Sequence, residues 1–65
     1  MIMNILELVV RLGVLATKTN ENSERLLRAL NTTDYAEKNE LISKALANSM
    51  AVTDMMITTL HDLNN

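Results

Sequence analysis

The sequence predicts an all-α fold, an antiparallel αα-hairpin of two long helices that self-associates into a helical bundle, most simply a four-helix bundle dimer. Proline is absent and glycine occurs once, so no residue forces a long helix to break. The one strong turn signal, Asn-Thr-Thr-Asp at residues 31–34, lies at the middle of the chain. The 65 residues therefore form a single domain, with helices at about 3–30 and about 35–63 joined by the turn 31–34.

The first predicted helix is apolar around most of its circumference in its first half. Asn4, Glu7 and Arg11 fall on one narrow stripe, and apolar side chains cover the remaining arc of roughly 260°. Such a helix needs neighbours on several sides, which a chain of this length does not supply alone. Residues 17–23 hold weak helix formers, and a break there would give three helices. We expect a continuous helix, because no Gly or Pro marks a break.

The turn and the second helix have clearer signals. Asn31 is expected to close the first helix in the left-handed conformation, and Asp34 or Thr33 to cap the second. Glu37 has capping-box spacing from Asp34. Tyr35 is expected to pack against Leu30. The second helix is amphipathic, and its apolar side is made of Leu41, Ile42, Ala45, Leu46, Ser49, Val52, Met56, Leu60 and Leu63.

An antiparallel hairpin pairs positions whose numbers sum to about 65. This register places Gly13 near Val52, and we expect Gly13 to allow a close approach of the helices. Bulky apolar residues gather at the open end, where one hairpin cannot hide them all. The predicted oligomer interface consists of Ile5, Leu8, Val9, Leu12, Leu15, Val52, Met56 and Leu60.

Composition and motifs argue against several classes of function. The net charge of −2 gives no general attraction to nucleic acid or to anionic lipid. Cysteine is absent, and His61 has no ligand or acid–base partner at helical spacing, so we expect no enzyme activity, no metal and no cofactor. Glu7 and Arg11 interrupt the apolar stretch, which is shorter than the ~20 residues of a membrane span. No secretory signal is evident, so we expect a cytoplasmic protein without a membrane span.

The expected function is that of a small non-enzymatic oligomeric interaction protein. It would act as a regulator, inhibitor or adaptor by binding another macromolecule, in the manner of phage- or plasmid-type accessory proteins. Its expected partners are a second copy of itself and another protein. The alternative is a nucleic-acid-binding regulator that uses a basic stripe of Arg11, Lys18, Arg25 and Arg28. Acidic residues interleave with this stripe, which is more typical of a solvated mixed-charge face.

In length, central turn and helical content, the chain resembles the plasmid copy-number regulators of the Rop type. Members of that family are αα-hairpins that dimerise into a four-helix bundle and bind RNA on a helical face. No residue motif accompanies the resemblance. It therefore implies a fold and an assembly, and no RNA-binding residue is carried over to this chain.

Overall fold

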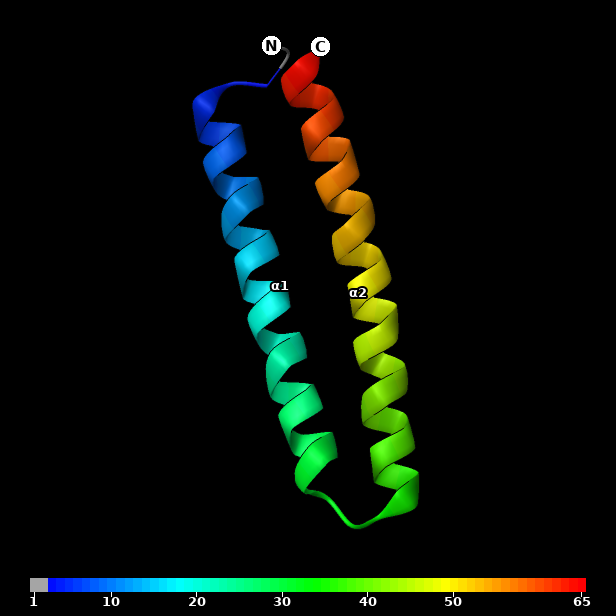
Figure 1. Cartoon of the computed structure of the whole chain (residues 1–65). Coiled ribbons are helices and arrows are strands. Elements are labelled where there is room, and N and C mark those ends of the chain that lie inside the picture. Colours follow the sequence, from blue (N-terminus) through cyan, green and yellow to red (C-terminus); the bar gives the residue numbers. More distant parts are fainter. Residues whose placement is uncertain (1–2) are drawn as a thin grey trace.

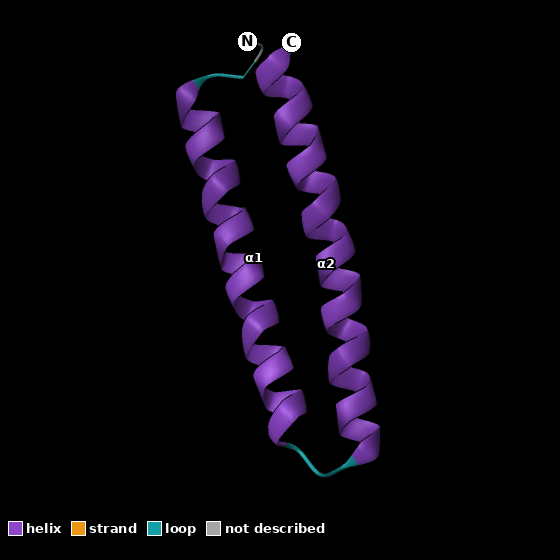
Figure 2. Ribbon diagram, viewed as in Figure 1, coloured by secondary structure: helices purple, strands orange, loops and turns teal. Residues whose placement is uncertain are grey.

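The computed structural model describes residues 3–65, which form two helices. Helix α1 (Ile5–Asn31) and helix α2 (Tyr35–Asn64) lie side by side and antiparallel, so the first turn of α1 and the last turn of α2 lie at the same end of the hairpin, its open end (Figure 1). Figure 2 shows the short N-terminal segment and the turn as the non-helical parts of this range. The predicted all-α hairpin is confirmed. Met1 and Ile2, part of the apolar N-terminal stretch, lie outside the described residues.

Helix α1 begins two residues later than predicted and then runs without interruption. Asn4 is its N-cap, and the Asn4 Oδ1 atom accepts a hydrogen bond from the Glu7 N–H at 2.8 Å. The polar segment 17–23 is helical throughout, which confirms the continuous helix. Thr17 donates its hydroxyl to the carbonyl of Gly13 at 2.9 Å, so this weak helix former is satisfied within the helix.

The turn differs from the prediction in how α1 ends. No residue in the range 3–65 has a positive φ, so the expected left-handed Asn31 is wrong. Thr32 leaves the helix directly in an extended conformation, and its hydroxyl accepts from the Asp34 N–H at 3.2 Å. Asp34 caps α2 as predicted, because its Oδ1 atom accepts from the N–H groups of Ala36 and Glu37. The Glu37 carboxylate accepts from Thr32 instead of completing a capping box.

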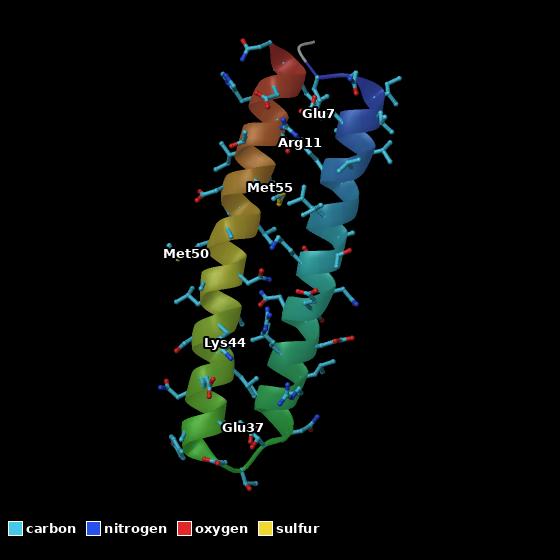
Figure 3. All side chains as sticks on the ribbon, turned by 180° about the vertical axis from the view of Figure 1, so that it is seen from behind. Glu7, Arg11, Glu37, Lys44, Met50 and Met55 are labelled. Carbon is cyan, nitrogen blue, oxygen red and sulfur yellow. The ribbon has the colours of Figure 1, made fainter. Side chains whose placement is uncertain are left out.

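The two helices meet along one row of residues on each, which we call the seam. Steps of three and four residues alternate along both rows, as in the lengthwise contact of a coiled coil. All seam residues are buried or half-buried. They are Leu8, Arg11, Leu15, Lys18, Asn22, Arg25 and Ala29 on α1, and Lys38, Leu41, Ala45, Asn48, Val52, Met55, Thr59 and Asp62 on α2. Figure 3 shows Met55 pointing toward α1, whereas Met50 points away from it.

The seam is a weak core for a folded monomer. Its middle is polar: Asn22 donates to the Ser49 hydroxyl at 2.8 Å, and Asn48 donates to the Lys18 carbonyl at 2.9 Å. The pairing of Lys18 with Asn48 agrees with the predicted register, whereas the pairs Asn22–Ser49 and Arg11–Asp62 join positions whose numbers sum to 71 and 73. The hairpin exposes 4916 Å², whereas a compact monomer of 7.3 kDa exposes about 4,200 Å². The chain therefore leaves about 700 Å² more surface uncovered than its mass requires.

Candidate interaction surface: the uncharged face of the hairpin

On each helix, the residues that come directly after the seam residues in the sequence form a second row. One step along a helix turns the side chain by about 100°, and because the helices are antiparallel, both rows turn to the same side of the hairpin. We call the surface they form the uncharged face, because none of its residues carries a charge. Its members are Ile5, Val9, Leu12, Ala16, Thr19, Ser23, Leu26 and Leu30 on α1, and Tyr35, Asn39, Ile42, Leu46, Ser49, Thr53, Met56, Leu60 and Leu63 on α2.

An open groove of about 950 Å³ lies between the helices on this face. Its walls include Leu12 and Leu15 from α1 and Met56, Leu60 and Leu63 from α2, and no charged side chain lines it. A groove of this size with apolar walls is typical of a binding site or a subunit contact. It lies toward the open end, where the sequence predicted an apolar excess.

Large apolar side chains of the uncharged face are exposed along its whole length. The exposed fraction is 73% for Ile5 near the open end and 63% for Leu46 near the middle. At the turn end, Leu30 is 74% and Tyr35 88% exposed, so the predicted packing of these two side chains is wrong. Both belong to the uncharged face, and nothing in a single hairpin covers them.

The residues of the predicted oligomer interface fall into two groups. Ile5, Val9, Leu12, Met56 and Leu60 lie on the uncharged face and are exposed. Leu8, Leu15 and Val52 lie in the seam and are half-buried. Leu15 also lines the groove. The periodicity of the sequence did not distinguish the seam from the uncharged face, which are separate rows in the structure.

The opposite side of the hairpin has the reverse character. The residues that come one position before the seam form this charged face: Glu7, Val10, Val14, Thr17, Glu21, Glu24 and Arg28 on α1, and Glu37, Glu40, Lys44, Ala47, Ala51, Asp54, Thr58 and His61 on α2. Glu40 and Lys44 form an ion pair along it at 3.1 Å. The charged face is therefore suited to contact with water, whereas the uncharged face is not.

The predicted basic stripe is divided between the seam and the charged face. Arg11, Lys18 and Arg25 are half-buried in the seam, and Arg28 is on the charged face. Arg11 donates to Asp62 at 2.8 Å and to Glu7 at 3.0 Å, and Figure 3 shows Arg11 between the helices near Glu7. The hydrogen bond to Asp62, followed by the one to Glu7, raises the pKa of Arg11 above its ordinary value.

Arg28 forms an ion pair with Glu37 at 3.5 Å. Two of the four cations of the stripe are therefore already paired with acids of the same chain. A phosphate group would have to compete with these carboxylates for Arg11 and Arg28.

Gly13 does not have the role that the sequence predicted. A Cβ atom added at this position would meet no atom within 4 Å, so Gly13 does not permit a close approach of α1 and α2. Gly13 comes two residues after Arg11 of the seam, and two steps turn it by about 200° from that row. The predicted neighbour Val52 lies in the seam itself.

Within residues 3–65, no three His, Asp or Glu side chains gather closely enough to hold a metal ion. Neither helix in this range combines the length and the apolar character that crossing a membrane requires. Comparison of the chain with protein-family models, with curated protein sequences and with solved structures finds no match.

Proposed function

We propose that the chain is a small non-enzymatic interaction protein that works as a homodimer, in which two hairpins pack their uncharged faces together into a four-helix bundle. The absence of charge along one whole face, with the charged groups on the seam and the opposite face, carries the proposal. In a bundle, each helix needs one row toward its neighbour in the chain and a second row toward the other copy. The seam and the uncharged face meet these two needs.

The size of the face supports the same assembly. The hairpin as a whole measures 48 by 16 Å in its two longest directions, so one side of it presents on the order of 800 Å², the area that each partner buries in a standard stable interface. The excess surface of the hairpin, about 700 Å², is close to this area. A second copy would therefore cover the exposed apolar side chains of the uncharged face, whereas Leu6, Leu27, Met50 and Ile57 lie outside that face.

The bundle would present its charged faces outward, on two opposite sides. Acids outnumber Arg and Lys by six to two on each charged face, and such a mainly acidic surface suits charge-complementary recognition of another protein. We therefore favour a regulator, inhibitor or adaptor that acts by binding a second protein. The nucleic-acid-binding alternative is weaker, because Arg11 and Arg28 are paired with carboxylates.

Sedimentation equilibrium of the full chain, with far-UV circular dichroism over the same concentration range, tests the assembly. We expect twice the mass of the 7.3 kDa chain, and a loss of helix on dilution. A stable helical monomer would contradict the proposal. Affinity capture from the native cell, with and without nuclease, tests the type of partner. A nuclease-resistant protein partner is expected, and a partner lost on nuclease treatment would favour the nucleic-acid alternative.

A further inference from the structure

The uncharged face changes in chemistry along its length. Toward both ends it carries bulky apolar residues, such as Leu12 and Leu60 near the open end and Leu26 near the turn. Between these ends lies a group of small polar side chains, which we call the polar band. It consists of Thr19 and Ser23 on α1 and Ser49 and Thr53 on α2, together with Asn20, which lies beside Thr19 outside the uncharged face and lines the groove. Four of these five residues line the groove, and Ser49 lies beside them on α2.

The polar band lies at the midpoint of the hairpin. Helix α1 spans residues 5–31 and α2 spans residues 35–64, so their midpoints fall near residues 18 and 50. The band is also tied to the seam at this level. Ser49 accepts from Asn22 at 2.8 Å, which leaves the Ser49 hydroxyl proton free to donate elsewhere. The Asn22 Oδ1 atom is enclosed and has no partner among the described residues.

We propose that the polar band fixes the register of the two hairpins, so that the band of one copy lies on the band of the other and the copies overlap over their full length. The inference rests on the dimer proposed above. In a coiled coil, a polar residue in an otherwise apolar contact specifies register at a cost in stability. The polar band supplies such a layer from both helices of each copy.

A dimer in which one copy is displaced along the other would lose the contact between the two polar bands. If the two turns lie at the same end and one copy slides by seven residues, Thr19 and Ser23 come to the level of Leu26 and Leu30 in the other copy, and their hydroxyls are buried without partners. Buried polar groups without partners are unfavourable. The aligned register places hydroxyls and amides together, where they can bond across the interface. This argument holds whether the two turns lie at the same end or at opposite ends, because the band is at the midpoint in either case.

The experiment measures the distance between identical spin labels in the two copies. The chain has no cysteine, so Ala51→Cys gives a single label site. Ala51 is exposed on the charged face, one residue from the midpoint of α2. Pulsed electron paramagnetic resonance of the labelled dimer should give one narrow distance. A slip of seven residues would displace one label along the bundle by about 10 Å.

The variant Thr19→Val, Ser23→Ala, Ser49→Ala, Thr53→Val removes the hydroxyls of the band. We expect this variant to stay dimeric, to melt at a higher temperature, and to give several distances instead of one. Thr17→Val with Thr58→Val is the matched control, because it removes exposed hydroxyls from the charged face. The control should keep the single distance.

A single narrow distance in the band variant would overturn the register proposal and leave the dimer intact. Several distances in the unmodified chain would overturn it as well. A monomeric mass in sedimentation would overturn the dimer and, with it, the register.

Discussion

Val9 and Val10 offer a matched pair of substitutions that separates the two faces of the hairpin. They are adjacent in α1 and almost equally exposed, at 58% and 57%. Val9 lies on the uncharged face and Val10 on the charged face. Val9→Asp and Val10→Asp therefore make the same chemical change in nearly the same surroundings of the single chain, and only the proposed dimer distinguishes them.

The expected difference is large. Covering the exposed part of Val9 is worth about 2 kcal/mol in each copy, so its loss from both copies removes about 4 kcal/mol, or roughly a thousandfold in the dissociation constant. Burial of two unpaired carboxylates adds several kcal/mol of desolvation to this cost. Val10→Asp keeps its carboxylate in water, and such surface changes stay within about 0.5 kcal/mol.

Sedimentation equilibrium and thermal melts at equal chain concentration measure both variants. Val9→Asp should be monomeric and largely unfolded at concentrations where Val10→Asp is dimeric and helical, because the single hairpin has so small a core. Equal behaviour of the two variants would refute the assignment of the uncharged face as the subunit interface. Dissociation by Val10→Asp alone would show that the copies meet through the opposite side.

Three further predictions concern single features of the hairpin. Gly13→Ala should raise the melting temperature, with a gain of about 0.8–1.0 kcal/mol in helix propensity, because no atom lies within 4 Å of the new Cβ; a lower melting temperature would show that a second copy approaches Gly13. Asp34→Ala should cost about 1 kcal/mol in a denaturant titration, and Asp34→Asn much less, since the amide oxygen can still cap α2; equal losses would argue against the cap. Short RNA and DNA should bind the unmodified chain weakly and without selectivity at low salt; tight binding that Arg11→Gln, Lys18→Gln and Arg25→Gln together abolish would establish the nucleic-acid alternative.

The sequence predicted the elements of this fold well, because their signals are local. The absence of proline, the central Asn-Thr-Thr-Asp and the capping side chain of Asp34 all act within a few residues. The turn, the length of both helices and the continuity of α1 through residues 17–23 followed from them. The end of α1 was predicted less well, because Asn31 and Thr32 were both able to close the helix and the choice depends on the hydroxyl of Thr32.

The rotation of each helix about its own axis was harder to predict. Apolar residues cover so much of the first half of α1 that periodicity does not say which of them face α2. Leu8 and Leu15 entered the seam, whereas Val9 and Leu12 stayed on the uncharged face.

Local sequence patterns also did not predict where the basic residues lie in the hairpin. Cations are expected in water, yet Arg11, Lys18 and Arg25 are half-buried between the helices. Their long aliphatic stems can cover apolar surface while the charged groups reach outward. The acid that pairs with Arg11, Asp62, lies 51 positions away in the sequence, and no local pattern identifies it.

The short connection between the helices has a consequence for the order in which the hairpin forms. Only three residues, 32–34, separate α1 from α2, so the contact of Thr32 with Glu37 closes a very small loop. The entropy lost on loop closure increases with loop length, so contacts at the turn can form before the Arg11–Asp62 pair that joins the two ends. Folding would then proceed as a zipper from the turn toward the termini. Amide hydrogens around Ala29 and Leu41, which are buried close to the turn, would exchange last with solvent, and the helix ends at the open end would fray first.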